Sequence, residues 1–415
     1  MPTTDPQGRV LAALDRLTAG FPGRLPSLGI AFSGGGDSTA LLAMAAEWAK
    51  RRGIRIMAAT VDHRLRPESA DEARRAGLEA ARLGVPHRVL VWPPPHPPGN
   101  ISAMAREARL RLLSAWAREE GLAAIALGHT RDDVAETLLM RLERGAGLDG
   151  LAAMAERREA EGMLWLRPML SVGRAELRDW LISRALRWVE DPTNEDPAHD
   201  RARIRQAIAM LGLDSARIAD SAMHLRTARE TLGRLACDAT SLAAVRLGML
   251  TLPQDIWTAT LPELRRLILI AVTRWITGAP YPPRAAATAE AMETLESGQM
   301  AQLGGTLIRP GAKLLKFMRE PAAAARAAPL VTDGVWDNRW RVTGLSKGLT
   351  VRALGDAAAR IDRQALDLPL AAARSMPALW DDGHMVASLL PTPPAGMTIA
   401  PLRGQGDFRR LLAEG

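Results

Sequence analysis

A glycine-rich turn between an apolar strand and a long helix most constrains what this chain can fold into. Residues 28–32 form a short apolar run typical of a strand in a parallel sheet, and residues 39–48 favour a helix without an internal breaker. The residues between them are Ser33, Gly34, Gly35, Gly36, Asp37 and Ser38. Glycine lets the backbone approach a ligand closely, and the N–H groups at a helix start attract anions. The turn therefore favours a phosphate site over a bare tight bend, although it lacks the lysine and the spacer of a Walker A loop.

Further apolar runs alternate with helical segments over the first half of the chain. Strands are predicted at residues 55–61, 87–92 and 122–127, and helices at residues 69–83, 101–120 and 131–143. This alternation predicts an α/β fold with a doubly wound parallel sheet. Because ligands bind at the carboxyl ends of such strands, we expect Ser33, the Asp62-His63 pair and His129 to meet in one crevice.

A second polar cluster begins at His129. Asp132, Asp133 and Glu136 follow it at spacings of three and four, so a helix would bring the three carboxylates together. A single acid at a helix start needs no more explanation than the helix dipole, which contributes about 0.3–1 kcal/mol. Three acids and a histidine at a sheet crevice instead suggest a site for Mg²⁺ or for a cationic substrate.

The length of 415 residues allows two or three domains. We expect residues 1–211 to form the α/β domain, residues 212–320 a mainly helical domain, and residues 328–415 a small α+β domain. Residues 303–319 and 335–342 each have the alternation and turn residues of a β-hairpin.

Charge and cysteine content narrow the function. The formal charge of +8 suggests a polyanionic partner such as nucleic acid. The single cysteine, Cys237, excludes a disulfide scaffold, a CxxC zinc site and two-cysteine sulfur transfer within this chain. No signal peptide is visible, and the longest apolar run, residues 267–272, is too short to span a bilayer, so we expect a cytoplasmic protein without membrane contact.

Five segments resemble, in their order along the chain, the tRNA(Ile)-lysidine synthases of the PP-loop ATP-pyrophosphatase superfamily. They are residues 33–38, 61–69, 127–145, 167–174 and 189–205. The resemblance implies an adenine nucleotide alpha hydrolase-like (PP-loop) fold for the first domain. The chain departs from the usual residues of the family at Leu110, Thr130, Val134 and Ala202.

The resemblance implies an ATP-dependent carbon–nitrogen ligase that makes lysidine in an isoleucine tRNA with a CAU anticodon. The C2 oxygen of the wobble cytidine would attack the α-phosphate of ATP and release pyrophosphate. The amine of free L-lysine would then displace AMP. ATP is the expected co-substrate, Mg²⁺ the expected metal, and the tRNA and free L-lysine the expected partners. The sequence does not reveal the oligomeric state, and a homodimer is one option.

The resemblance also implies roles for single residues. The turn from Ser33 to Ser38 would bind ATP, and Asp37 and Asp133 would hold the metal. Asp132, Asp133 and Glu136 would bind the lysine ammonium, and one of them would help to remove its proton. The expected catalytic residues are Asp37, Arg109, His129, Asp132, Glu136 and Arg205. The expected tRNA contacts are Asn194, Arg201, Arg203 and Arg205.

Two of these roles have alternatives. His129 would act as a base or would orient the nucleotide, and Arg109 and Arg205 would stabilise the pentavalent phosphorus or hold tRNA phosphate. For the whole protein, one rival is another PP-loop adenylating ligase that acts on RNA or on a small molecule. The other is a non-catalytic, ATP-gated RNA-binding protein. The single cysteine argues against a thiolase. A glutamine-dependent synthetase needs a cysteine nucleophile near its N-terminus, and this sequence has none there.

Overall fold

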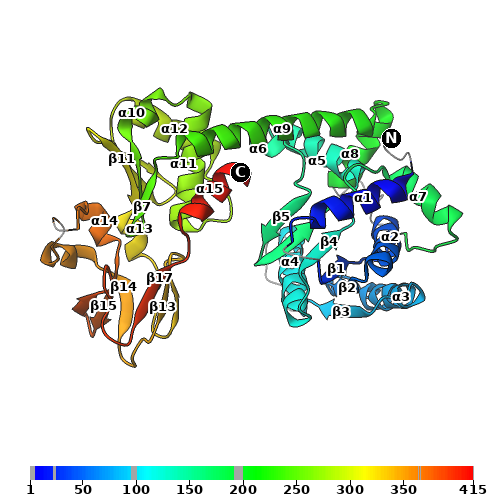
Figure 1. Cartoon of the computed structure of the whole chain (residues 1–415), viewed down its shortest axis with the longest axis horizontal. Coiled ribbons are helices and arrows are strands. Elements are labelled where there is room, and N and C mark those ends of the chain that lie inside the picture. Colours follow the sequence, from blue (N-terminus) through cyan, green and yellow to red (C-terminus); the bar gives the residue numbers. More distant parts are fainter. Residues whose placement is uncertain are drawn as a thin grey trace. The chain divides into compact units, whose positions relative to one another are not determined.

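The computed structural model describes residues 5–21, 25–94, 101–190, 200–362, 364 and 366–414. The chain divides into two compact units, Met1–Thr227 and Ala228–Gly415 (Figure 1). No helix within these described residues is long and apolar enough to cross a membrane.

The first unit is built around a six-stranded sheet. Its strands, in spatial order, are β3 (His87–Val91), β2 (Arg55–Asp62), β1 (Ser27–Ala31), β4 (Ala124–Leu127), β6 (Met163–Leu166) and β5 (Arg157–Ala160). Neighbouring strands are parallel from β3 through β6, and β5 runs antiparallel to β6. The predicted parallel sheet is confirmed. The β5–β6 hairpin is not predicted by the sequence pattern, because each strand has four residues and the turn consists of Glu161 and Gly162.

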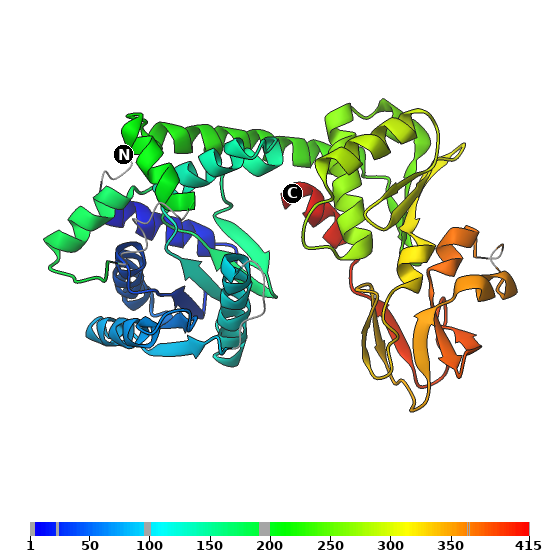
Figure 2. The same cartoon turned by 180° about the vertical axis from the view of Figure 1, so that it is seen from behind.

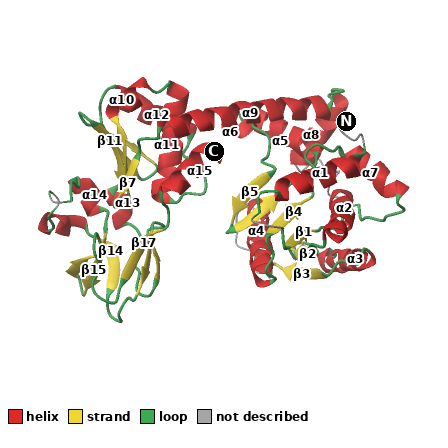
Figure 3. Ribbon diagram, in the orientation of Figure 1, coloured by secondary structure: helices red, strands yellow, loops and turns green. Residues whose placement is uncertain are grey.

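Helices cover both faces of this sheet (Figures 2 and 3). Ile30 of β1 belongs to the core that includes side chains of α1, α2 and α7, whereas the next residue, Ala31, packs on the other face with Trp116 of α4. Successive side chains of a strand point to opposite faces, so β1 is buried on both. The helices are α1 (Pro6–Thr18), α2 (Gly36–Arg52), α3 (Ser69–Arg82), α4 (Ile101–Glu119), α5 (Arg131–Glu143), α6 (Leu148–Leu151), α7 (Arg174–Ser183) and α8 (Asp200–Met210).

Helix α9 (Ser215–Ala239) leads into the second unit, whose first part combines helices with an antiparallel sheet. The helices are α10 (Gln254–Ala259), α11 (Pro262–Thr277) and α12 (Ala285–Glu296). The sheet has the order β7 (Ala244–Arg246), β8 (Met249–Pro253), β11 (Leu314–Arg319), β10 (Thr306–Arg309) and β9 (Ala301–Leu303). The hairpin predicted within residues 303–319 is confirmed as β10–β11. Strands β7 and β8 differ from the helical pattern expected there, because a two-residue turn at Leu247 and Gly248, both with positive φ, reverses the chain.

The last part of the chain holds two three-stranded sheets. One has the order β12 (Gly334–Trp336), β13 (Trp340–Thr343), β17 (Thr398–Pro401), and the other has the order β14 (Thr350–Ala353), β15 (Pro377–Asp381), β16 (His384–Ser388). The hairpin predicted at residues 335–342 is confirmed as β12–β13, with Asp337 and Asn338 in the turn at positive φ. The final helix, α15 (Gln405–Glu414), then packs through Phe408 and Leu412 into the core formed by α11 and the five-stranded sheet.

Candidate active site

The glycine turn joins β1 to α2 and leaves the start of that helix uncapped by side chains. Gly34 has a φ of +83°, where a residue with a Cβ is strained. Gly35 is the N-cap of α2 and makes no side-chain capping bond, so the positive helix end remains available to an anion. The Ser38 hydroxyl closes the turn: it accepts a hydrogen bond from the Ser33 N–H at 3.2 Å and donates one to the Gly35 carbonyl at 2.9 Å. This is the geometry that a phosphate site requires.

A cavity of about 370 Å³ opens at this turn. Its walls include Ser33, Asp37, Arg109, His129, Asp133, Arg174, Arg178, Arg201 and Arg205. A second cavity of about 250 Å³ lies at the end of β2, where Asp62 and His63 line it, and it shares Ser33 and Arg109 with the first. The crevice expected at the carboxyl ends of the strands is therefore a pair of adjoining cavities.

Helix α5 presents the acidic cluster, and its start is fixed by a capping box. The Thr130 hydroxyl accepts a hydrogen bond from the Asp133 N–H at 3.4 Å, and Asp133 Oδ2 accepts one from the Thr130 N–H at 2.8 Å. The departure from the family at position 130 thus provides the helix cap. Because Oδ2 of Asp133 is committed to this cap, only its Oδ1 atom is directed to the arginines.

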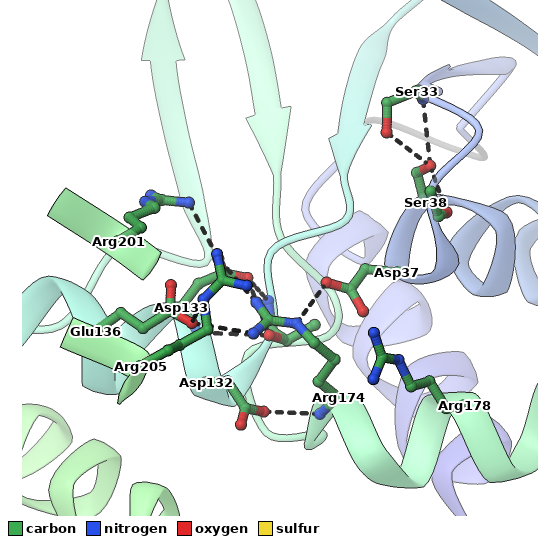
Figure 4. A network of polar contacts seen from close by, with 12 residues as sticks. Ser33, Asp37, Ser38, Asp132, Asp133, Glu136, Arg174, Arg178, Arg201 and Arg205 are labelled. Carbon is green, nitrogen blue, oxygen red and sulfur yellow. Dashed lines mark hydrogen bonds and ion pairs between the residues drawn. The ribbon is translucent and has the colours of Figure 1, made fainter. Parts of the chain in front are cut away.

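One guanidinium, that of Arg174, joins the acids of two helices (Figure 4). Its Nε lies 3.1 Å from Asp37 Oδ2, its Nη1 lies 3.0 Å from Glu136 Oε1, and its Nη2 lies 3.5 Å from Asp133 Oδ1. The backbone N–H of Arg174 also donates to Asp132 Oδ2 at 2.7 Å. Asp132 therefore faces the start of α7, whereas the other three acids converge on the guanidinium.

Helix α8 supplies two further cations to the same acids. Arg201 Nη1 lies 3.1 Å from Asp133 Oδ1, and Arg205 Nε lies 3.1 Å from Glu136 Oε1. The second oxygen of Glu136, Oε2, is buried and has no hydrogen-bond partner among the described residues. Arg203 instead pairs with the exposed Glu143 at 3.1 Å, away from the cluster. The predicted tRNA contact Asn194 lies outside the described residues.

Arg109, from α4, lines both cavities. Burial lowers its pKa, and the nearby cations Arg106 and Arg201 lower it further. No described carboxylate forms an ion pair with Arg109, whereas an incoming anion would relieve this unfavourable charge. The position between the two cavities therefore suits a phosphate group.

His129 follows β4 and is neutral. Burial is the main cause that lowers its pKa to about 3. Arg167 Nε donates to His129 Nδ1 at 3.1 Å, so Nδ1 is the unprotonated nitrogen and Nε2 carries the hydrogen. An imidazole with this pKa is a weak base at neutral pH, and its Nε2–H is a hydrogen-bond donor.

The acids around Arg174 differ in how readily they hold a proton. Burial raises the pKa of both Asp37 and Glu136, and the charge of Arg174 only partly offsets it. For Asp133, burial alone would raise the pKa, but the neighbouring His129, Arg174 and Arg201 and the Thr130 N–H bond outweigh it, so its pKa is lowered. Asp133 is therefore the member that holds a proton least readily, whereas Asp37 and Glu136 are better suited to accept one.

The chain is similar in sequence to known proteins. Residues 12–211 match a family model described as a PP-loop domain. A tRNA(Ile)-lysidine synthase of Ruegeria pomeroyi is 40% identical over 407 residues, which cover 95% of this chain and 96% of the relative. One of Mesorhizobium japonicum is 34% identical over 359 residues, which cover 81% of this chain and 77% of the relative.

The chain belongs to the tRNA(Ile)-lysidine synthase family. The predicted family and the predicted PP-loop fold are confirmed. Two arginines of the cavity, Arg174 and Arg178, were not among the site residues expected from the sequence. A signal for Arg174 was available, because it ends the 167–174 segment that carries part of the resemblance to the lysidine synthases.

The residues fit a magnesium ion only in part. No group of three or more His, Cys, Asp or Glu side chains in the described part of the chain is arranged to hold a metal. Both carboxylate oxygens of Asp133 already have partners, Thr130 for one and arginines for the other. Asp37 borders the glycine turn and contacts Arg174 through one oxygen, so its other oxygen is the better candidate ligand.

Proposed function

We propose that this lysidine synthase homologue joins free lysine to C2 of the wobble cytidine in a tRNA with a CAU anticodon, at the expense of ATP. One observation carries the assignment of the site: the phosphate-binding turn and the acid–arginine cluster open onto the same cavity of about 370 Å³. A ligase of this kind needs both, because one region must bind the pyrophosphate that leaves and the other the amine that attacks.

The nucleotide occupies both cavities in this proposal. The turn from Ser33 to Ser38 binds the pyrophosphate end, and the cavity at the end of β2 receives the nucleoside. Arg109 lies where the two cavities join and stabilises charge at the α-phosphate. Mg²⁺ bound by the phosphates, with Asp37 as the protein ligand, would neutralise phosphate charge and make the phosphorus more electrophilic.

The first step is the activation of cytidine. The C2 oxygen forms a bond to the α-phosphorus, and the bond from that phosphorus to the leaving pyrophosphate breaks. His129 supplies an Nε2–H donor at the cavity wall, which fits a positioning role and not that of a base. The cytosine must leave its stack to reach this depth, as loop bases do when a protein modifies them.

The second step is the attack of lysine. The side-chain ammonium pairs with Asp133 and with Glu136, whose Oε2 is buried and has no partner within the described part of the chain. Glu136 accepts a proton from the ammonium, because burial raises its pKa. The free amine nitrogen then bonds to C2, and the C2–O bond breaks as AMP departs with the oxygen.

The test is the incorporation of labelled lysine into a CAU-anticodon tRNA with ATP, together with release of pyrophosphate. We expect Asp37→Asn to abolish both signals. The matched control is Asp71→Asn, which removes an exposed carboxylate at the start of α3. If the wild-type protein binds the tRNA but never forms RNA-linked lysine, the proposed reaction is wrong.

We also propose that tRNA contacts extend beyond the cavity. Arg201, Arg203 and Asn194 remain the proposed contacts near the anticodon, and the second unit is proposed to discriminate between tRNAs. In support, a cavity of about 720 Å³ in that unit is lined by Arg309, Lys313 and Lys316. Because α15 belongs to the core of α11, charge-reversal variants of these three residues test the role better than deletion of residues 328–415.

A further inference from the structure

Arg174 contacts Glu136 Oε1 and Asp133 Oδ1, and these are the two carboxylates that the substrate amine requires. We propose that Arg174 competes with the lysine ammonium for Glu136 and Asp133, and that phosphate bound at the glycine turn draws the guanidinium away. Nucleotide binding then opens the amine site, so that ATP binds before lysine. This inference rests on the proposed function and assigns Arg174 as the positioning residue that sets the order of binding.

The contacts of Arg174 identify it as the competitor. It is the cation that reaches three carboxylates from two different helices: Asp37, Asp133 and Glu136. Arg201 and Arg205 each contact one of these acids. Within the described part of the chain, the three carboxylates and three guanidinium groups of this cluster therefore balance, so a further ammonium adds excess positive charge unless one arginine leaves.

The backbone of Arg174 is held, so the side chain is the part that can turn. Its N–H is bound by Asp132 at 2.7 Å, and the preceding N–H, that of Gly173, is bound by Glu176 Oε2 at 2.7 Å. A fixed helix start with a long side chain allows the guanidinium to exchange partners through rotamer changes alone.

Phosphate bound at the glycine turn can compete with the carboxylates for the guanidinium of Arg174. Arg174 already reaches towards the turn through Asp37, the second residue of α2. Among the described residues, five arginines line the cavity at the glycine turn, against three acids, Asp37, Asp133 and Glu190, so it favours a strongly anionic ligand. Arginine binds phosphate through two parallel hydrogen bonds, which compete well with its contacts to separate carboxylates.

The experiment measures lysine binding by isothermal titration, with and without Mg²⁺ and α,β-methylene-ATP, which binds but cannot release pyrophosphate. We expect wild-type protein to bind lysine at least tenfold more tightly with the nucleotide, within the range of about 5–150-fold usual for coupled sites. In Arg174→Gln the ratio should fall to near one, because lysine binds without nucleotide. Arg184→Gln is the matched control, since it removes a cation at the end of the same helix, outside the cavity, where it pairs with Glu47 at 3.2 Å, and it should keep the coupling.

Steady-state kinetics separate this role from a structural one. In Arg174→Gln the KM for lysine should fall while kcat also falls, because the competitor and a phosphate-binding cation are lost together. Arg174→Lys should restore part of the coupling. If Arg174→Gln does not fold, Arg174→Lys and the wild-type titrations still decide the question.

Two results would overturn the inference: lysine affinity of the wild type that does not depend on the nucleotide, or coupling that survives in Arg174→Gln. Either result, obtained with a protein that still forms lysidine, rejects the role of Arg174 and leaves the proposed function standing. Failure of the wild type to form lysidine at all rejects the proposed function instead.

Discussion

Replacement of Glu136 by glutamine tests both the stability and the chemistry of the site. The Glu136 side chain is 1% exposed and contacts Arg174 at 3.0 Å and Arg205 at 3.1 Å. Breaking a buried ion pair costs about 3–5 kcal/mol, and glutamine keeps one carbonyl oxygen as an acceptor. We therefore expect Glu136→Gln to lose about 3 kcal/mol of unfolding free energy, the lower end of that range.

The same change should weaken the use of lysine. A hydrogen bond to a charged group contributes about 1.5–3 kcal/mol, and glutamine also cannot accept the proton of the ammonium, so kcat/KM for lysine should fall by at least roughly 10- to 150-fold. The assay is incorporation of labelled lysine into the tRNA at several lysine concentrations, with urea unfolding measured on the same samples.

Helix α5 offers a matched control. Glu143 lies on the same helix and pairs with Arg203 at 3.1 Å, but both side chains are exposed. Exposed pairs contribute about 0–1 kcal/mol, so Glu143→Gln should change stability and lysine use little. Equal losses in the two variants, or a Glu136→Gln protein with unchanged kcat/KM, would refute the assignment of Glu136 to the amine site.

Three further predictions follow from the backbone and from pKa shifts. Gly34→Ala should weaken binding of α,β-methylene-ATP by roughly 5- to 30-fold in isothermal titration, because a Cβ in this left-handed conformation costs about 1–2 kcal/mol. Burial alone would raise the pKa of Glu176, but the hydrogen bond from the Gly173 N–H helps to lower it. Ionised Glu176 thus stabilises the fold above its ordinary pKa of 4.5, and this contribution disappears as pH falls through the lowered value. Glu176→Gln, measured by urea unfolding, should cost about 1 kcal/mol at pH 7 and progressively less in acid, since Glu176 is partly exposed. Gly248→Ala should destabilise the second unit by about 3 kcal/mol in thermal unfolding, because the new Cβ would lie 2.6 Å from Trp340 in addition to the strain.

Two glycines serve as controls for these backbone arguments. Gly84 and Gly298 also have positive φ, but a Cβ at either would meet no atom within 4 Å. Gly84→Ala should lower stability without changing nucleotide affinity. Gly298→Ala should destabilise the second unit less than Gly248→Ala. Weaker nucleotide binding in Gly84→Ala would contradict the reasoning. So would a Gly298→Ala protein that is destabilised as much as Gly248→Ala.

Features encoded in short stretches of sequence were predictable. The glycine turn could be assigned because its strand, its glycines and its helix are contiguous. The acidic cluster could be assigned because Asp132, Asp133 and Glu136 are spaced within one turn of a helix. The hairpin at Asp337 and Asn338 was predictable for the same reason, since turn residues specify it locally.

Features that depend on contacts between distant segments could not be predicted from the sequence. Strands β5 to β8 are three to five residues long, too short for a periodic signal. Helix α15 is amphipathic, but nothing in its sequence indicates that Phe408 fills the core beside α11.

By itself the sequence determined the anion-binding turn, the acids on one helix and the alternation that makes a parallel sheet, because each depends on residues within a few positions of one another. The tertiary structure decided what those acids contact. The cluster joins four residues that are far apart in the chain: Asp37, Glu136, Arg174 and Arg205. They meet only because the sheet brings the starts of α2, α5 and α7 to one edge, with α8 packed against α5. Burial and the distances between these groups set their pKa values, and neither can be read from a local pattern of residues.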